Sequence, residues 1–173
     1  MAQRILGIDP GTIQFGYGLL EADRGEGSYL TAGVIKAPRS MEIGGRLHRI
    51  HTELLALLET WRPDVVAVEE PFIPPEVASR GGHRTSVRSA MAVGQAQAVA
   101  LLAAAHYGLD VHRYPPSRVK SAVSGYGQGS KQQVAAMVGL LLGLSKPPEP
   151  VDATDALAVA ICHLQHERLN TMV

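Results

Sequence analysis

The stretch RILGIDPGTIQFGYG, residues 4–18, decides the fold of this chain. Its first part, Arg4–Asp9, is a short apolar run that ends at Pro10-Gly11, which predicts a buried β-strand closed by a turn. Asp9 is the last residue of that strand, so the sequence places a carboxylate where a buried strand leaves the core.

Two further strands are expected after this turn. The runs Gly16–Glu21 and Tyr29–Lys36 are apolar, β-branched or aromatic, and the residues between them, ADRGEGS, favour a turn. We therefore expect these runs to pair as an antiparallel hairpin.

The rest of the chain alternates helical and strand patterns. Leucines and isoleucines recur at helical spacing from Ile43 to Trp61, which predicts a helix. VVAV (Val65–Val68) is too apolar for a strand with one solvent-exposed face, so we expect a buried strand there. The remaining expected elements are a helix over Ser86–Ala105, a strand over Val111–Tyr114, and helices over Ser117–Val123, Lys131–Leu142 and Asp152 to about Arg168. This order predicts an α/β fold, a mixed sheet with helices on both faces.

Length and composition exclude several classes of protein. The chain has 173 residues, 46% hydrophobic and 18% charged, which fits one domain over residues 1–173 and excludes an intrinsically disordered chain. Its apolar runs, such as Val134–Leu144, are too short for a membrane span, and its first residues do not resemble a signal peptide. We therefore expect a cytoplasmic protein without a membrane partner. The single cysteine, Cys162, excludes an intramolecular disulfide framework.

A formal net charge of zero hides an uneven distribution. Between Val77 and Pro148 the chain carries eight basic residues and one acidic residue, whereas the remainder has eight basic and fifteen acidic residues. Such a basic half is compatible with a surface for a phosphate backbone. Charges that merely solvate helix faces would give the same count.

Carboxylates follow the two most buried strands. Asp9 ends the first, Glu69 and Glu70 end the strand at Val65–Val68, and the carboxyl ends of strands in α/β sheets are common ligand sites. Asp152 and Asp155 are three residues apart and therefore share a helix face. Converging carboxylates suit a hard cation such as Mg²⁺ or Mn²⁺.

Each carboxylate also has an ordinary explanation. Asp152 could be a helix N-cap with Asp155 as its N3 partner, and the turn after Asp9 could be structural or could wrap a nucleotide phosphate with Thr12. Glu69 and Glu70 could simply mark a strand that leaves the core. Only the joint pattern favours a metal site.

Several motifs in this order resemble the RuvC family of Holliday-junction resolvases over nearly the whole chain. The motifs are Leu6-Gly7-Ile8-Asp9-Pro10-Gly11 with Gly16-Tyr17-Gly18, then Ala67-Val68-Glu69-Glu70-Pro71-Phe72, Val119-Lys120, Gly125-Tyr126-Gly127 leading to Lys131-Gln132-Gln133-Val134, and Asp152-Ala153-Thr154-Asp155-Ala156-Leu157-Ala158. The resemblance implies an RNase H-like fold, a homodimer, and metal-dependent cleavage of four-way DNA junctions by paired nicks during recombination and repair. It also implies the RuvA-RuvB branch-migration complex as a partner.

Site residues follow from the same resemblance. The family's acidic residues carry over to Asp9, Glu69, Asp152 and Asp155, with Glu69 chosen over Glu70 because it occupies the Glu of the apolar-Glu-x-x-Phe run. Two Mg²⁺ ions, replaceable by Mn²⁺, would activate water and stabilise the leaving oxygen of a phosphodiester. The expected DNA-binding residues are Phe72, which would stack on an unpaired base, together with Lys120, Lys131, Arg80, Arg84 and Arg88.

Two other classes remain open. The GIDPGT stretch also resembles the phosphate loop of actin-like and sugar-kinase ATPases, but 173 residues are too few for the second nucleotide-binding half that those enzymes need. A junction-binding module without catalysis is the other alternative, and the complete set of carboxylates argues against it.

Overall fold

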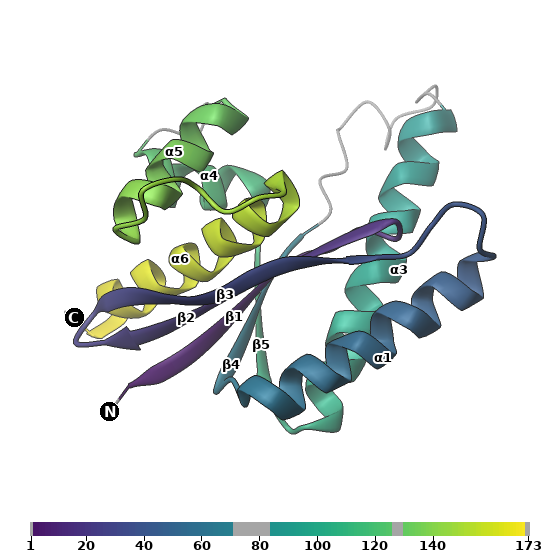
Figure 1. Ribbon diagram of the computed structural model, residues 1–173, viewed down its shortest axis with the longest axis horizontal. Coiled ribbons are helices and arrows are strands. Elements are labelled where there is room, and N and C mark those ends of the chain that lie inside the picture. The colour runs from purple at the N-terminus through teal and green to yellow at the C-terminus, as the bar shows by residue number, and fades with distance from the viewer. Residues whose placement is uncertain (1, 71–83, 126–129, 172–173) are drawn as a thin grey trace.

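The fold is a five-stranded mixed sheet between two layers of helices (Figure 1). The computed structural model describes residues 2–70, 84–125 and 130–171. The strands lie in the order β3-β2-β1-β4-β5: β1 (Gln3–Asp9), β2 (Gln14–Asp23) and β3 (Glu26–Lys36) are antiparallel neighbours, and β4 (Val65–Glu69) and β5 (Asp110–Tyr114) run parallel to β1. The expected antiparallel start followed by parallel strands is confirmed.

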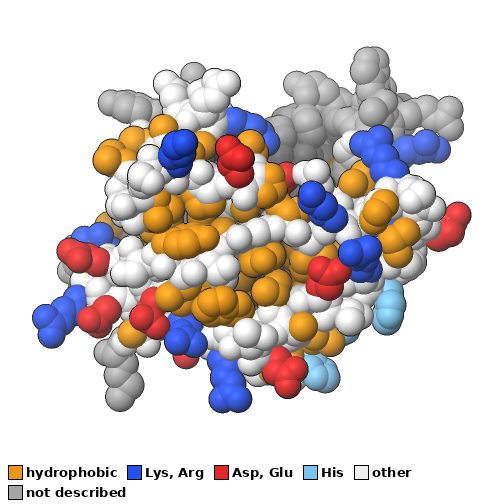
Figure 2. Space-filling model, viewed as in Figure 1, with side chains coloured by type: hydrophobic (Ala, Val, Ile, Leu, Met, Phe, Trp, Pro, Cys, Tyr) orange, Lys and Arg blue, Asp and Glu red, His pale blue; other side chains and the backbone are white. Residues whose placement is uncertain are grey.

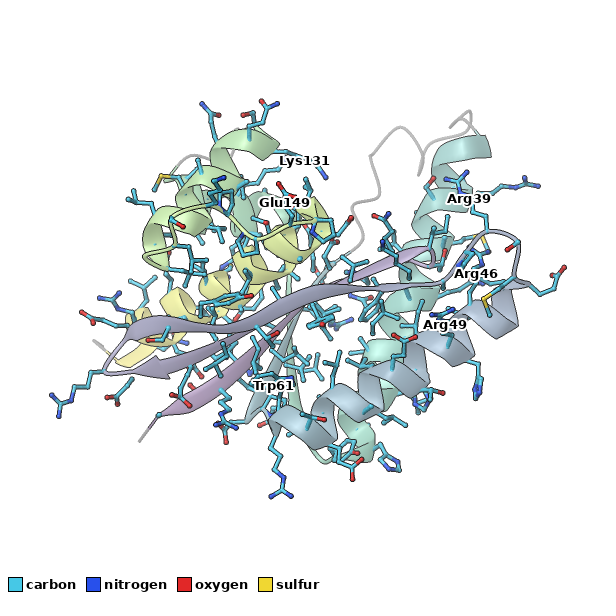
Figure 3. All side chains as sticks on the ribbon, viewed as in Figure 1. Arg39, Arg46, Arg49, Trp61, Lys131 and Glu149 are labelled. Atoms are coloured by element: carbon cyan, nitrogen blue, oxygen red, sulfur yellow. The ribbon has the colours of Figure 1, made fainter. Side chains whose placement is uncertain are left out.

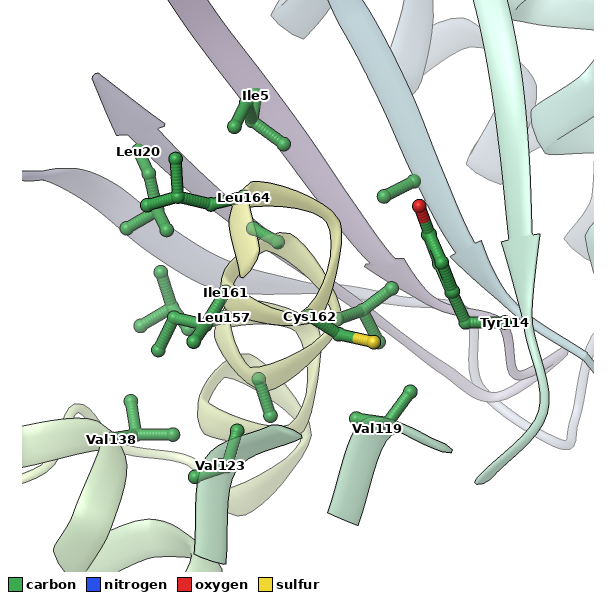
Figure 4. Close-up of a cluster of buried hydrophobic side chains, with 14 of the residues drawn as sticks. Ile5, Leu20, Tyr114, Val119, Val123, Val138, Leu157, Ile161, Cys162 and Leu164 are labelled. Carbon is green, nitrogen blue, oxygen red and sulfur yellow. The ribbon is translucent and has the colours of Figure 1, made fainter. Parts of the chain in front are cut away.

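Helices cover both faces of this sheet. One face carries α4 (Pro116–Ser124), α5 (Lys131–Leu141) and α6 (Val151–Thr171), and the other carries α1 (Ile43–Trp61) and α3 (Arg84–His106) (Figure 1). Each layer encloses its own cluster of buried apolar side chains, and Figure 4 shows the cluster around α6. The sheet therefore separates two cores.

Strand parity decides which residues enter which core. In β1, Ile5 packs in the α6 core, whereas Leu6 and Ile8 pack in the α1 and α3 core. Because successive side chains point to opposite faces of a strand, Asp9 lies on the same side as Ile5, toward α6. The same parity in β4 places Glu69 on the side of Val65 and Ala67, again toward α6.

The hairpin is longer and its turn tighter than the sequence pattern predicts. β2 continues to Asp23 and β3 begins at Glu26, so that only Arg24 and Gly25 form the turn. Both have positive φ, 52° and 84°, as a two-residue hairpin turn requires. The predicted hairpin is confirmed, and its strands are longer than expected because polar residues at the exposed end of a hairpin can pair without being buried.

The last helix begins one residue earlier than expected. α6 starts at Val151, so Asp152 lies inside its first turn and is not the N-cap. The alternative in which Asp152 is the N-cap and Asp155 its N3 partner is therefore wrong. Both carboxylates lie on the helical segment that approaches the sheet.

Glycines in β1 and β2 allow α6 to lie directly on the sheet. A Cβ atom added at Gly7 would lie 2.1 Å from the carbonyl oxygen of Ala156 and 2.7 Å from the backbone nitrogen of Ala160. One added at Gly18 would lie 2.6 Å from Cγ of Leu157. Gly7 and Gly18 are also register partners, so together they form a groove that a side chain would fill.

Helix α3 has one packed face and one exposed apolar face. Ala96, Ala100 and Ala103 are buried in the core, whereas Ala98 and Ala105 are exposed on the outer surface. Met91 and Leu102 are each 62% exposed. The segment Val87–His106 is long and apolar enough to cross a membrane, with 28% of it buried, although a core helix passes the same test. The expected absence of a membrane partner remains a prediction.

The glycine groove makes a prediction about stability. Gly7→Ala forces a methyl group against the backbone of α6, and overpacking of this kind costs about 1–3 kcal/mol. Gly44→Ala is the matched control, because a Cβ at Gly44 on α1 meets nothing within 4 Å and alanine favours a helix. Urea unfolding should show a lower midpoint for Gly7→Ala and an unchanged or higher midpoint for Gly44→Ala. Equal midpoints for Gly7→Ala and the unsubstituted chain would contradict the close packing described above.

Candidate active site

Two carboxylates lie side by side at the carboxyl edge of the sheet. β1 and β4 are parallel neighbours, with Ile8 opposite Val68. Asp9 and Glu69 are the next residues along these strands, and both lie on the α6 face. The register of two buried strands thus brings together two acids that are 60 positions apart in the sequence.

Helix α6 adds further carboxylates. The start of this helix lies so close to β2 that a Cβ at Gly16 would be 2.2 Å from the carbonyl oxygen of Asp152 and 3.3 Å from Cβ of Asp9. Asp155, one turn later, lines the same cleft as Asp9 and Glu69. Asp152 does not line this cleft, but its charge acts on Asp9, so the structure brings all four predicted acids into one region.

The cleft has a volume of about 220 Å³ and a mixed wall. Its acids face two cations, because Lys120 of α4 and Lys131 of α5 also line it. The rest of the wall is apolar and consists of Pro116, Val119, Val134 and Ala158. Such a wall limits the access of water to the carboxylates.

Burial and repulsion keep a proton on Asp9. Desolvation, followed by the charges of Glu69, Asp155 and Asp152, raises the pKa of Asp9 from 3.8 to about 8. Lys131 acts in the opposite direction but does not offset these effects. At neutral pH and without a cation in the cleft, Asp9 is therefore protonated.

The neighbouring acids share this environment. Burial and then the charge of Asp155 raise the pKa of Glu69, while a hydrogen bond with Asp9 acts to lower it. Asp155 has a partner of its own, because Lys131 Nζ lies 3.2 Å from its Oδ2. This ion pair raises the pKa of Lys131. One ammonium group thus neutralises part of the acidic cluster.

The structure separates Glu69 from Glu70. Glu70 lies on the opposite side of the strand end, and its carboxylate is 3.8 Å from Nε of Arg113. Glu69 lines the cleft. The choice of Glu69, which rested on a resemblance alone, agrees with strand parity once the pairing of β4 is known.

Local sequence explains where the two lysines lie. Helix α4 begins with Pro116 after an extended Pro115 and ends at Ser124, where Gly125 with a φ of 74° caps it. Helix α5 begins with a capping box, in which the Ser130 side chain accepts from the backbone of Gln133 and the Gln133 side chain accepts from the backbone of Ser130. This cap fixes the start of α5 at Lys131, whose Nζ lies 3.2 Å from Oδ2 of Asp155 on α6.

The donor chemistry of the site fits a hard divalent cation. All of the clustered acids offer carboxylate oxygens, and their mutual repulsion in a poorly solvated cleft would be relieved by positive charge. Among the described residues, no three His, Cys, Asp or Glu side chains already form a ligand cluster. The carboxylates would therefore have to close around an incoming ion.

The other predicted DNA-binding residues lie away from this cleft or cannot be placed. Phe72 and Arg80 fall outside the described residues, and Arg84 lies at the start of α3 with a side chain that is not described. Arg88 is exposed in the first turns of α3 and does not line the cleft. Their roles stay predictions.

Sequence reasoning missed the apolar wall of the cleft. Val119 and Val134 have the spacing of ordinary core residues, and both do belong to the α6 core. A signal was available, since Val119, Val134 and Ala158 all stand in the quoted motifs beside the predicted lysines and acids.

Comparisons with known proteins agree on one family. The family profile described as "Crossover junction endodeoxyribonuclease RuvC" matches residues 5–163. A protein of that name from Dehalococcoides mccartyi is 48% identical over 163 residues, which cover 94% of this chain and 93% of the relative. One from Heliobacterium modesticaldum is 49% identical over 158 residues, covering 91% of each chain.

Solved structures give the same answer. The structure of Thermus thermophilus RuvC in complex with a Holliday junction substrate superposes with a TM-score of 0.84 at 35% identity, covering 98% of this chain and 97% of the other. The yeast mitochondrial Holliday junction resolvase Ydc2 shares the fold, with a TM-score of 0.63, 17% identity and coverage of 99% of this chain and 85% of the other. Together with the expected RNase H-like sheet and the clustered acids at its edge, these matches show that the chain belongs to the RuvC family of crossover junction endodeoxyribonucleases.

Proposed function

We propose that this protein is a structure-selective endonuclease that resolves Holliday junctions by paired, symmetric nicks during homologous recombination and DNA repair. The observation that carries the proposal is the cleft in which Asp9, Glu69 and Asp155 face Lys120 and Lys131. Carboxylates that need a cation, next to ammonium groups that attract phosphate, suit the hydrolysis of a phosphodiester. No nucleophilic Ser or Cys is needed, because water attacks the phosphorus.

The cofactor we propose is Mg²⁺, with two ions per site and Mn²⁺ as a substitute. Asp9, Glu69, Asp152 and Asp155 would hold these ions, which when bound activate water and stabilise the leaving oxygen. When the ions bind, two changes are required of the protein itself: one carboxyl group has to lose its proton, and one ion pair has to rearrange. Asp9 has to lose its proton as the cation enters, and Asp155 has to share or release Lys131.

The two lysines would position the DNA strand. Lys120 is partly buried against the cleft wall, whereas the Lys131 side chain is 75% exposed. A lysine released from Asp155 can donate to a phosphate oxygen near the scissile bond. Phe72 is proposed to stack on an unpaired base, with Arg80, Arg84 and Arg88 as contacts to the DNA backbone.

A homodimer would place two such sites on one junction. The junction has approximate two-fold symmetry, and a closed dimer holds a second site at a fixed distance. The outer face of α3 supports this proposal, because Val87, Met91 and Leu102 are exposed on it, and Ala98 is exposed between them. A single domain over residues 1–173, a cytoplasmic location and a RuvA-RuvB partner complete the proposal and rest on sequence and family.

The carboxylates make the first prediction. Asp9→Asn and Glu69→Gln should each lower cleavage of a synthetic four-way junction in Mg²⁺ by more than about 100-fold, because each removes a ligand, and should leave junction binding nearly intact. Glu70→Gln is the matched control, since Glu70 faces Arg113 outside the cleft. Mapping of nicks on end-labelled strands measures the effect. Cleavage by Asp9→Asn at the unsubstituted rate would overturn the site.

The pKa of Asp9 makes a prediction about stability in EDTA. Because the folded pKa of about 8 exceeds the unfolded 3.8, the folded protein holds a proton that the unfolded chain releases between these values. Raising the pH from 6 to 8 should therefore destabilise the metal-free fold by on the order of 2 kcal/mol. Asp9→Asn removes this contribution, so thermal melting should show a smaller fall with pH for the variant. Parallel curves for the two proteins would contradict the shifted pKa.

The proposed dimer predicts the products from a plasmid-borne cruciform. Heterodimers that combine the unsubstituted chain with Asp9→Asn should release circles nicked on one strand, because only one site can cut. Homodimers of the unsubstituted chain should release linear DNA. Differently tagged subunits, purified through both tags, provide verified heterodimers, and linear product from these would argue against paired incision by two sites.

A further inference from the structure

Arg46 links helix α1 to the loop that follows the strand of Asp9. The side chain is half-buried, and its Nη1 lies 3.3 Å from Thr12 Oγ1 and 3.4 Å from the Thr12 carbonyl oxygen. Thr12 is itself buried and stands three residues after Asp9. The guanidinium group therefore lies beside the active-site loop, on the α1 side of the sheet.

The charge of Arg46 has no anionic partner among the residues that the structure describes. None of the ion pairs formed there includes Arg46, although Arg4, Arg49 and Arg113 each have a carboxylate. Both acceptor oxygens on Thr12 are neutral, and their distances of 3.4 and 3.3 Å from Nη1 are long for hydrogen bonds. In addition, Nε of Arg46 is buried without a hydrogen-bond partner. Withdrawing a guanidinium group from water without a counter-charge costs free energy, which an anionic ligand would offset.

Other arginines gather at the same end of the molecule. Arg39 is exposed on the segment before α1, and Arg49 is exposed one turn after Arg46, with its Nε 2.9 Å from Glu53 (Figure 3). Figure 2 shows Lys and Arg side chains at the upper right, over the end of the molecule where α1 begins. In Figure 3, Lys131 on α5 and Arg46 on α1 lie on the two sides of the end of β1.

We propose that Arg46 binds a backbone phosphate of the DNA strand that enters the active site, with Arg39 as a second contact on the same surface. The proposal rests on the proposed nuclease function. A strand whose scissile phosphate lies at Asp9 has its next phosphates within reach of the surface around Thr12. The guanidinium group can then donate to a phosphate through Nη2 while Nη1 stays near Thr12. This contact fixes the path of the strand on the side of the cleft opposite Lys131.

The first test measures junction binding without metal. Fluorescence anisotropy between 50 and 300 mM salt gives Kd and its salt dependence for Arg46→Gln, Arg46→Lys, Arg39→Gln and Arg62→Gln. Arg62 follows the far end of the same helix and is the matched control. We expect Arg46→Gln to raise Kd about fivefold to tenfold and to reduce the salt slope by about one. Arg46→Lys should recover part of the lost affinity, and Arg39→Gln should raise Kd by less than Arg46→Gln. Arg62→Gln should match the unsubstituted chain.

The second test locates the phosphate. Single neutral methylphosphonates are placed in turn along the cleaved strand of the junction. At one or two positions beside the scissile bond, a methylphosphonate should weaken junction binding by the unsubstituted protein. At the same positions it should leave binding by Arg46→Gln unchanged. A profile in which both proteins respond alike at every position would overturn the proposal.

Thermal melting and cleavage at saturating DNA distinguish the alternatives. A lower melting temperature and a lower kcat with unchanged Kd and salt slope would mean that Arg46 only supports the Thr12 loop, and would overturn the proposal. Equal losses in Arg46→Gln and Arg62→Gln would also overturn it, because they would indicate a general effect of charge. Binding with the expected changes, but no cleavage by the unsubstituted protein, would contradict the nuclease function and leave the phosphate site standing.

Discussion

The approach of α6 to the sheet is the constraint on which the rest of the structure depends. Backbone atoms of this helix lie where the Cβ atoms of Gly7 and Gly16 would be, so the helix and strands are in direct contact. This contact brings the acids of α6 close enough for their charges to act on Asp9. The position of Asp155 in the cleft, the burial and then the repulsion that raise the pKa of Asp9, and the apolar wall at Ala158 all follow from this contact. Packing of glycine against backbone thus sets the electrostatics of the site.

The sequence predicts most of the fold because its patterns are local. The helix over Ile43–Trp61 was predicted with its observed bounds, since its leucine spacing is regular and Pro63 follows it. The turn at Arg24-Gly25 and the start of α6 at Val151 were missed. The turn depends on the pairing of polar residues such as Asp23 with Glu26, and the start of α6 depends on the geometry of its first turn; hydrophobic periodicity records neither.

The residues of the candidate site also fall into those that the sequence predicts and those that only the structure identifies. A resemblance to a family supplied Asp9, Glu69, Asp152 and Asp155 at once, whereas strand parity places Glu69 on the cleft side only once the register of β4 is known. The unpaired charge of Arg46 had no signal in the sequence at all. An arginine at this helical position is typical of a solvated face, and only the contact with Thr12 across 34 residues shows otherwise. Contacts between residues far apart in the sequence leave no local pattern, so they cannot be predicted from a short stretch of the chain.

The separation of the two cores by the sheet bears on how this protein can evolve. The acids, the lysines and the apolar wall belong to the layer of α4, α5 and α6, whereas the exposed face of α3 belongs to the other layer. Substitutions on the outer side of α3 change neither the glycine groove nor the register of β1 with β4. The surface proposed for subunit contact and the acidic cleft therefore belong to different layers, so that the outer side of α3 can change in sequence while the packing that holds the carboxylates stays the same.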